Sequence, residues 1–366
     1  MRTREQPIAL LDFRDELLLK IIACMTTTEG RGLLLCCRRL SNLTRPSVFQ
    51  KRQREVRVLL VFFGAEFATI QGRCNLGPAP APSQAVGLVV TASTDRTLRV
   101  WRLADGACLR TLTGHTDAVI AVVDVGGGRV ASGGEGGVLR VWDVLSGKQL
   151  QQTPTGEGFI WCAAALWGSR VATGHYGGDI RLWSLGSGGR AAGVLRGHAD
   201  TVCSLAVVGG CTVQRLLASS SWDRSVRLWD VDAGTCTAVL NGHTNLVRCL
   251  ADLGGGRLLS GSLDRSVRVW NTAMGACLAV VPNAHGEGDG GSINAACALP
   301  GGAATVSLGG TVQRWKWDEG VNALTPDGAA LQLEDAGVDS LAAMPRPDGA
   351  LQLLVSCREH FEGARP

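Results

Sequence analysis

Short apolar runs alternate with polar turns along most of the chain. Two β-branched runs joined by a tight turn that holds Asp or Gly recur six times, and a Trp lies in or after the second run of every copy. The copies span residues 88–102, 129–143, 170–184, 216–230, 258–271 and 303–317. Apolar alternation around such a turn is typical of a β-hairpin. The pattern therefore predicts a chain built mainly of short antiparallel strands.

Six tryptophans mark the same place in the six copies. They are Trp101, Trp142, Trp183, Trp229, Trp270 and Trp315. Their spacings are 41, 41, 46, 41 and 45 residues, and a Ser or Thr stands ten residues before each one. A period of about 40–45 residues is typical of a β-propeller, in which each repeat supplies one four-stranded blade. We therefore predict an all-β fold, a seven-bladed propeller over residues 86–366.

Other polar residues recur with the same period. A Gly-His pair lies upstream of three copies, and an Asp lies six residues before the Trp in three copies. These residues resemble the WD40 family, and the resemblance implies that hydrogen bonds join the His, Ser or Thr, Asp and Trp of a blade. The implied structural residues, besides the six tryptophans, are His198, Asp223, His243 and Asp264. Three copies have Gly136, Gly177 and Gly309 in place of Asp, so we expect their networks to be incomplete.

The last part of the chain contains an incomplete copy. Residues 338–357 have the pattern of the two inner strands of a seventh blade, and Pro366 stands where the next Trp is due. An unpaired edge strand is an aggregation hazard. We therefore expect the strand at 55–63 to pair with this blade and close the ring, and an open or truncated ring is the alternative.

Residues 8–50 have a different pattern. Asp12 or Asp15, followed by the apolar residues of LLLKII (17–22), predicts a capped amphipathic helix. The segments DELLLKI (15–21) and CCRRL (36–40) resemble an F-box, although the family's leading Leu-Pro is Phe13-Arg14 here. The resemblance implies docking on a Skp-type adaptor of a cullin ligase through Phe13, Leu17, Leu18, Ile21, Leu35 and Cys37. A helical hairpin that packs on the propeller is the alternative, and residues 51–85 are expected to be a linker and ring-closing region.

The resemblance to the WD40 family also indicates which residues face a partner. One class directly precedes the turn Asp, and the other lies near the start of each inner strand. These classes are Thr94, Glu135, Tyr176, Trp222, Leu263 and Leu308, and Ile120, Trp161, Cys203, Arg248, Asn294 and Asp339. Exposed aromatic residues beside an Arg are typical of an interaction hot spot. We predict that Trp161, Tyr176 and Trp222 bind a partner, and the alternative is that Trp161 and Trp222 plug the central channel.

Three arginines extend this prediction. Arg224, Arg248 and Arg265 belong to adjacent copies, and related F-box/WD40 receptors grip phosphorylated segments with Arg at such places. Bidentate contacts between Arg and phosphate are strong and directional. Another Arg recurs two residues before most of the tryptophans, which favours an alternative role at strand edges and in surface ion pairs.

Composition narrows the range of functions. The chain is 45% hydrophobic, but no apolar run reaches the roughly 18–20 residues that span a membrane. Residues 1–55 hold 11 Lys or Arg and 6 Asp or Glu, whereas the remainder is nearly balanced, so we expect no nucleic-acid partner. The 13 cysteines form no C-x-x-C pair, so we expect no metal, no cofactor and a cytoplasmic or nuclear location. Cys108, Cys236 and Cys277 recur seven residues after a Trp and are expected to be core residues.

No nucleophile elbow or phosphate-binding loop is present in the sequence, so we do not expect an enzyme. The sequence instead favours a substrate-recognition subunit of a cullin-type ubiquitin ligase. Its amino-terminal module would dock the adaptor, and one face of the propeller would hold the protein substrate. The alternative is a WD40 scaffold in another intracellular complex.

Overall fold

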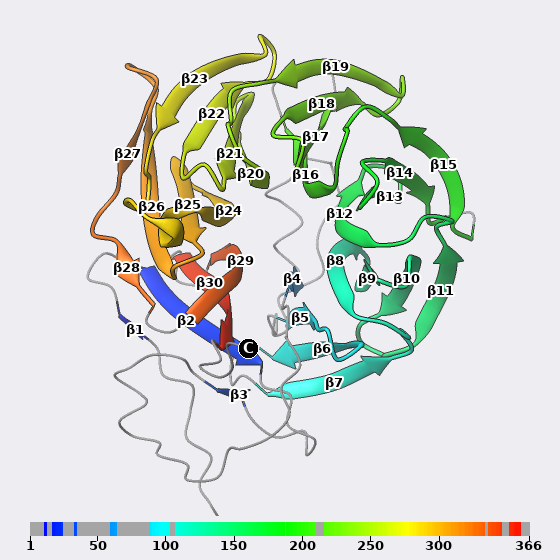
Figure 1. Ribbon diagram of the computed structural model, residues 1–366. Helices are drawn as coiled ribbons and strands as arrows, with labels where there is room; N and C mark the ends of the chain where they lie inside the picture. Colours follow the sequence, from blue (N-terminus) through cyan, green and yellow to red (C-terminus); the bar gives the residue numbers. More distant parts are fainter. Residues whose placement is uncertain are drawn as a thin grey trace, which may run out of the picture.

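Seven sheets are arranged around a common axis in the computed structural model (Figure 1). The structure describes residues 11–12, 17–24, 33–34, 59–63, 88–102, 107–186, 188–209, 216–333, 336–345 and 351–359. Six of the sheets have their first strand in chain order next to the axis, whereas the last sheet has β29 there, near β4 of the first sheet. The prediction of an all-β propeller is confirmed.

We number the blades one to seven from β4. Blade 1 contains β4 (Leu59–Phe63), β5 (Leu88–Ala92), β6 (Thr97–Arg102) and β7 (Cys108–Thr113). Blade 2 contains β8 (Val119–Gly126), β9 (Arg129–Gly134), β10 (Val138–Asp143) and β11 (Gln149–Pro154). Blade 3 contains β12 (Ile160–Leu166), β13 (Arg170–His175), β14 (Ile180–Ser184) and β15 (Arg190–Leu195).

The next blades follow the same order. Blade 4 contains β16 (Val202–Val208), β17 (Leu216–Ser221), β18 (Val226–Asp230) and β19 (Thr235–Leu240). Blade 5 contains β20 (Val247–Gly254), β21 (Arg257–Ser262), β22 (Val267–Asn271) and β23 (Ala276–Val281). Blade 6 contains β24 (Ile293–Leu299), β25 (Gly302–Ser307), β26 (Thr311–Asp318), β27 (Ala323–Pro326) and β28 (Leu331–Gln332), and a short 3-10 helix, η2 (Asp289–Gly291), precedes β24.

The seventh blade combines the two ends of the chain. It contains β29 (Ala336–Pro345), β30 (Leu351–Glu359), β2 (Leu17–Cys24), β1 (Leu11–Asp12) and β3 (Leu33–Leu34). Strand β2 pairs with β30 in parallel, so an amino-terminal strand covers the edge that the carboxyl-terminal hairpin would leave open. The ring is therefore closed, but by a different segment from the one expected.

Two predictions about the amino-terminal part are corrected here. Strand β4 (Leu59–Phe63) pairs with β5 as the inner strand of blade 1, so the 55–63 segment does not pair with the carboxyl-terminal blade. Residues 17–24 form strand β2 where a helix was predicted for the module at 8–50. The run LLLKIIAC is apolar throughout, and such a short run suits a buried strand as well as a helix, so the open edge of β30 decides between them. Phe13, Leu35 and Cys37 lie outside the described residues.

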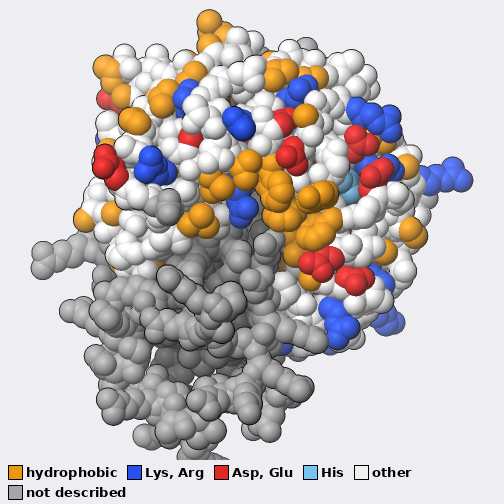
Figure 2. Space-filling model, in the orientation of Figure 1, with side chains coloured by type: hydrophobic (Ala, Val, Ile, Leu, Met, Phe, Trp, Pro, Cys, Tyr) orange, Lys and Arg blue, Asp and Glu red, His pale blue; other side chains and the backbone are white. Residues whose placement is uncertain are grey.

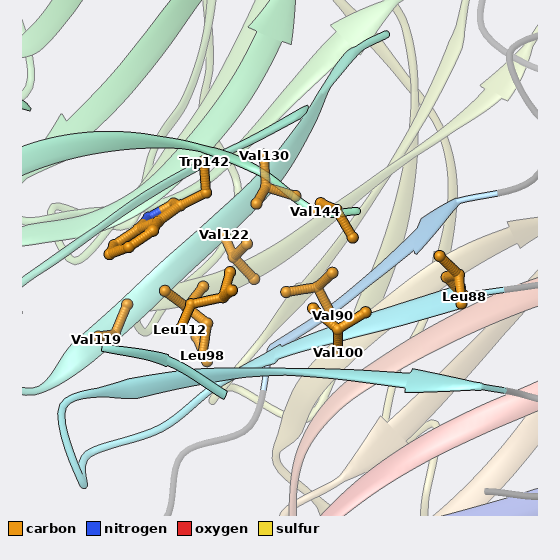
Figure 3. Close-up of a cluster of buried hydrophobic side chains, with 11 residues drawn as sticks. Leu88, Val90, Leu98, Val100, Leu112, Val119, Val122, Val130, Trp142 and Val144 are labelled. Carbon is orange, nitrogen blue, oxygen red and sulfur yellow. The ribbon is translucent and has the colours of Figure 1, made fainter. Parts of the chain in front are cut away.

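The hydrophobic core consists of layers between neighbouring blades. Figure 3 shows the layer between blades 1 and 2, where Val90 and Leu98 face Val122, Val130 and Trp142. The equivalent layers place Trp183, Trp229, Trp270 and Trp315 against the preceding blade. The six tryptophans are 1–6% exposed, and the indoles of blades 2 to 6 are among the larger apolar groups that join two blades.

Each indole is also bonded within its own blade. The Nε1–H of each Trp donates to the Ser or Thr hydroxyl ten residues earlier, at 2.7–2.9 Å. The acceptors are Thr91, Ser132, Thr173, Ser219, Ser260 and Thr305. The sequence prediction about these pairs is confirmed in all six blades. An indole N–H left without this acceptor would be buried and unsatisfied, which costs about 1–3 kcal/mol.

Blades 4 and 5 extend this bond into a full network. In blade 4, Ser219 Oγ lies 2.6 Å from Nε2 of His198, and Nδ1 of His198 lies 2.7 Å from Asp223. Burial would raise the pKa of Asp223, but the hydrogen bonds from His198 and Ser225 outweigh it and hold that pKa well below its usual range. In blade 5 the same positions are held by Ser260, His243 and Asp264. Both predicted His–Asp pairs are therefore confirmed.

Blades 2, 3 and 6 keep a histidine but have no Asp at the turn position. His115, His175 and His285 lie 2.7–2.9 Å from the hydroxyl that accepts the indole bond. Burial is the main cause that lowers the pKa of each imidazole from 6.5 to about 4. The expected incomplete network is confirmed in these blades, and its histidines are neutral at pH 7.

The turn between the second and third strands needs a left-handed residue. The residue five before each Trp has φ between +61° and +87° in all six blades. Gly137, Gly178 and Gly310 occupy this position in the blades without the turn Asp, and Arg96, Arg224 and Arg265 occupy it in the others. A non-glycine residue in this region costs on the order of 1–2 kcal/mol, and the side-chain bonds of the preceding Asp to the turn offset this cost.

The repeating cysteines are on the outside. Cys108, Cys236 and Cys277 are exposed, so their assignment to the core is wrong. Each is the first or second residue of the outermost strand of its blade and pairs with the Trp next to a bulge. Its thiol donates to the carbonyl two residues later at 3.4–3.5 Å, which satisfies the group without burial.

We predict that Trp229→Ala lowers the free energy of unfolding by about 3–5 kcal/mol, because it removes a large buried side chain and leaves a cavity between two blades. Urea unfolding of the intact chain measures this change. The control is Leu145→Ala, because Leu145 is 67% exposed on a turn. Equal losses in the two variants would contradict the assigned role of the indole.

We also predict that the chain loses stability as the pH falls from 6.5 to 4. The three histidines without Asp protonate near 6.5 when unfolded and near 4 when folded, so the unfolded chain binds more protons in this interval. Their contribution is fully present above pH 6.5, and each proton changes the free energy by about 1.4 kcal/mol per pH unit. Urea unfolding across this range measures the slope. His285→Gln should reduce the slope by about one proton, and an unchanged slope would contradict the assignment.

Candidate functional site

One face of the propeller carries a repeated irregularity at the start of each inner strand. The strand bulges after its first residue in blades 2 to 6 and after its third residue, Val338, in blade 7. The residues at the bulge are Ile120, Trp161, Cys203, Arg248, Asn294 and Asp339. These are the inner-strand positions identified from the sequence. A bulge leaves one residue out of the ladder and re-aims its side chain.

The residue before each turn Asp or Gly lies beside such a bulge. In blades 2 to 6 its backbone N–H donates to the carbonyl of the residue immediately before the inner strand, at 2.8–3.3 Å. Tyr176 donates to Phe159 in this way, and Trp222 donates to Thr201. This repeated bond brings the two classes of position together on the face formed by the second-to-third strand turns and the loops between blades.

Four aromatic residues form a cradle on blades 3 and 4, which we call the aromatic cradle. Phe159 stacks on Trp161 with ring centroids 5.2 Å apart. Trp161 meets Trp222 edge to face at 5.4 Å, and Tyr176 meets Trp222 edge to face at 6.0 Å. The structure therefore brings together all three aromatic residues that the sequence singled out. Phe159, Trp161 and Trp222 are partly buried, whereas the Tyr176 side chain is 58% exposed.

A cavity of about 440 Å³ opens beside the aromatic cradle. It is lined by Glu157, Gly158, Phe159, His175, Tyr176 and Gly177. The loop that forms one wall is anchored by Thr155, whose hydroxyl donates to the carbonyls of Gly137 and Glu157. The opposite wall is the turn after β13, and Gly177 there has no atom within 4 Å of the position of a Cβ. The cavity is therefore bounded by the loop between blades 2 and 3 and by a turn of blade 3.

The cavity wall contains Glu157, which forms an ion pair with Arg181, and a neutral histidine, His175. Glu157 accepts a hydrogen bond from Arg181 at 2.6 Å, and Arg181 also donates to the Thr155 carbonyl. His175 is 1% exposed, and burial followed by the charge of Arg181 lowers its pKa to about 4. Nδ1 of His175 lies beside the Phe159 backbone without a hydrogen bond of normal geometry to any described residue. The imidazole is therefore a neutral polar group in the cavity wall.

Arg248 lies on the neighbouring part of the same face. Its guanidinium donates to Oδ1 of Asn294, the bulge residue of blade 6, at 2.9 and 3.2 Å. On its other side is Cys203, where burial raises the thiol pKa to about 12 although the Arg248 charge and the Trp222 indole oppose the rise. A thiol with this pKa is not a nucleophile at neutral pH. Arg248 thus continues the face from the cradle toward blades 5 and 6.

The other predicted residues lie on separate turns. Arg224 is exposed and Arg265 is partly exposed, and each holds the left-handed position of its turn in blade 4 or blade 5. Leu263 is partly buried and donates its N–H to the carbonyl of Leu246 beside the Arg248 bulge. The shared contact of Arg224, Arg248 and Arg265 with one phosphate stays a prediction.

The cradle belongs to a wider apolar patch. Figure 2 shows hydrophobic side chains gathered over the inner ends of β12 and β16, with acidic side chains at several of its borders. Large contiguous apolar patches on a soluble protein mark interaction sites more often than single exposed residues do. The sequence missed Phe159, Glu157 and His175, and the only signal for them was the unusual copy in which FIW (159–161) follows a loop without Gly-His.

No group of three or more His, Cys, Asp or Glu side chains within the described ranges could hold a metal ion. Among the described residues no helix is long and apolar enough to cross a membrane.

Comparison with known proteins identifies the repeats. The profile of the WD40 family, described as WD domain, G-beta repeat, matches residues 106–143, 189–230 and 234–271. Each matched stretch begins near the outermost strand of one blade and ends at the third strand of the next. The chain therefore contains WD40 repeats, and each repeat links two consecutive blades.

Short stretches of the chain resemble curated proteins. They are 38% identical over 55 residues to human F-box and WD repeat domain containing protein 10B and to human F-box/WD repeat-containing protein 10. They are 45% identical over 56 residues to Cell division control protein 4 of Saccharomyces cerevisiae. Each match covers 15% of this chain and only 5–7% of the relative's length.

Solved structures share the fold. The crystal structure of RRP9 WD40 repeats and the structure of U3-55K each give a TM-score of 0.65 at 19% identity. The match covers 80% of this chain and 84% or 86% of the other. At this identity the likeness shows the WD40 propeller fold alone.

Proposed function

We propose that this WD40-repeat propeller binds a polypeptide partner through the aromatic cradle and the face around it, as a non-catalytic scaffold. WD40 repeats are protein-interaction modules, and the finer assignment to this face rests on one observation. Three aromatic residues at the predicted partner-facing positions touch one another and remain partly exposed. Trp and Tyr dominate the energy of protein interfaces because a rigid ring buries much area at a small entropic cost.

The arrangement favours binding over a purely structural plug. Trp161 and Trp222 are partly buried, but Tyr176 extends the cluster and exposes 58% of its side chain. The cavity beside Tyr176 lies between the loop that joins blades 2 and 3 and a turn of blade 3, next to the ring that a partner side chain would cover. A residue that served only to fill the channel would have no need of this exposed extension.

We predict that Tyr176→Ala and Trp222→Ala remove at least one protein that co-purifies with the intact chain. Both variants should unfold at nearly the wild-type temperature, and Trp222→Ala should cost much less stability than Trp229→Ala, because Trp222 lies at the surface of the ring. Quantitative mass spectrometry of the co-purified proteins and thermal unfolding measure the two effects.

Leu145→Ala is the matched control, because Leu145 is exposed on the turn between β10 and β11, at the opposite ends of the strands. An unchanged set of partners in both cradle variants would reject this face as the binding site. Equal losses of melting temperature for Trp222→Ala and Trp229→Ala would show that Trp222 is a core residue.

A second proposal is that the chain is the substrate receptor of a cullin-type ubiquitin ligase. It is supported by the short similarities to two F-box/WD repeat proteins and by the segment DELLLKI (15–21). In this role the propeller face would hold the substrate, and the receptor would raise the substrate's effective concentration near the ligase. The Skp-type adaptor would contact Leu17, Leu18 and Ile21.

In this role the amino-terminal segment would have to leave its pairing with β30. Leu17 to Ile22 pair in register with Leu351 to Ser356 of β30. An adaptor that binds the segment as a helix would have to take these backbone groups from β30 and expose its edge. Adaptor binding and ring closure by β2 would therefore compete.

We predict that a purified Skp-type adaptor is recovered with the intact chain and that Leu17→Asp prevents the recovery. Tyr176→Ala should leave adaptor recovery unchanged, because the cradle lies on a different part of the protein. A quantitative pull-down with purified components measures both.

No recovery with the wild-type chain, or unchanged recovery with Leu17→Asp, would reject the receptor role. If the wild-type chain does not bind the adaptor and Leu17→Asp lowers the melting temperature, the segment acts as a closing strand alone.

A further inference from the structure

The chemistry of the partner can be argued from the groups around the aromatic cradle, and this step rests on the proposed function. The rings of Trp161, Tyr176 and Trp222 meet edge to face, so they do not cover one another's π faces completely. The face of an aromatic ring carries negative potential, and Trp attracts a cation more strongly than Tyr or Phe does. A set of partly exposed rings at this spacing suits an apolar or a cationic side chain.

The loops around the cradle favour the cation. On this face of blades 2 to 4 they hold six carboxylates, on Asp117, Glu135, Glu157, Asp179, Asp200 and Asp223. They hold two guanidinium groups, on Arg196 and Arg224. Three strand arginines also reach these loops: Arg181 is bound to Glu157, and the guanidinium groups of Arg140 and Arg227 lie beside Gly114 and Gly197. Six negative and five positive groups therefore leave a net charge of −1. An acidic rim raises the local concentration of cations and disfavours anions.

The cavity itself adds no positive charge that is free to oppose a cation. The neutral His175 forms part of its wall, and the Arg181 guanidinium is held by Glu157 and the Thr155 carbonyl. Arg248 directs its guanidinium to Asn294 on the side of blade 6. Glu157 still exposes 38% of its side chain at the mouth of the cavity.

We infer that the aromatic cradle and the adjoining cavity bind a cationic side chain, Lys or Arg or a methylated form, from the partner polypeptide. The aliphatic stem lies against the rings, and the charged head lies toward Glu157 and the acidic rim. A phosphorylated residue would add negative charge beside the carboxylates of this rim. Near the cradle, Arg224 and Arg248 would oppose the repulsion. The cradle is therefore the cationic subsite of the binding face.

The test uses the intact chain and capped peptides, N-acetyl-Gly-Xaa-Gly-amide. Xaa is Lys, trimethyllysine, Arg, norleucine or phosphoserine. Norleucine is the matched control for Lys, because it keeps the apolar stem and lacks the charge. Quenching of tryptophan fluorescence at low and high salt gives the dissociation constants.

We expect at least one cationic peptide to bind roughly twofold to thirtyfold more tightly than norleucine, the range given by a cation–π contact of about 0.5–2 kcal/mol. Tyr176→Leu should remove most of this preference, whereas Tyr176→Phe should keep it, because the ring and not the hydroxyl carries it. Glu157→Gln should weaken the cationic peptides and leave norleucine unchanged.

Several results would overturn the inference. They are equal binding of norleucine and Lys, tighter binding of phosphoserine, full selectivity in Tyr176→Leu, and no binding of any cationic peptide. The outcome is separable from the proposed function. If the cradle variants lose a protein partner but the wild-type chain shows no preference for cationic peptides, the binding face stands and its cationic subsite does not.

Discussion

The structure depends on a buried indole that is apolar on its faces and hydrogen-bonded at its edge. Each ring packs in the layer against the preceding blade, while its N–H is held by a hydroxyl on the neighbouring strand of its own blade. The bond joins the second and third strands, so it fixes their register and the position of the turn between them. That turn carries Tyr176 in blade 3 and Trp222 in blade 4. A bond in the core therefore sets the geometry of the face that we propose to be functional.

The cradle lies where the repeat is least regular. Blade 3 has no Gly-His in the loop before its inner strand, and His175 at the end of β13 bonds Thr173 in its place. The loop is held by Thr155 instead, and the cavity lies between this loop and the glycine-rich turn that follows His175. Positions that break a local rule in an otherwise consistent fold are often functional. The loop that lacks Gly-His, and so leaves the network of blade 3 incomplete, thus also forms one wall of the cavity beside Tyr176.

The repeated part of this fold could be read from the sequence because its determinants are local. The hairpins, the six indole bonds and the turn positions each recur at a constant offset from a Trp, so one copy explains the others. The strand at 17–24 and its pairing with β30 could not be read in this way, because LLLKIIAC suits a helix or a strand and its partner lies more than 300 residues away. Phe159, Glu157 and His175 were missed for a related reason. They belong to the copy that departs from the repeat.

Closure of the ring connects its stability to the amino-terminal segment. Blade 7 has an inner hairpin, β29 and β30, but no buried Trp on a third strand of its own, and β2 supplies six paired positions along β30 instead. A parallel pair closes the edge, yet it lacks the indole bond that fixes the register in the other six blades. Strand β2, which closes the ring, is therefore held by its pairing with β30 on one side and by the two-residue strands β1 and β3 on the other. Any partner that binds this segment in another conformation therefore acts on the ring at the edge that β2 closes.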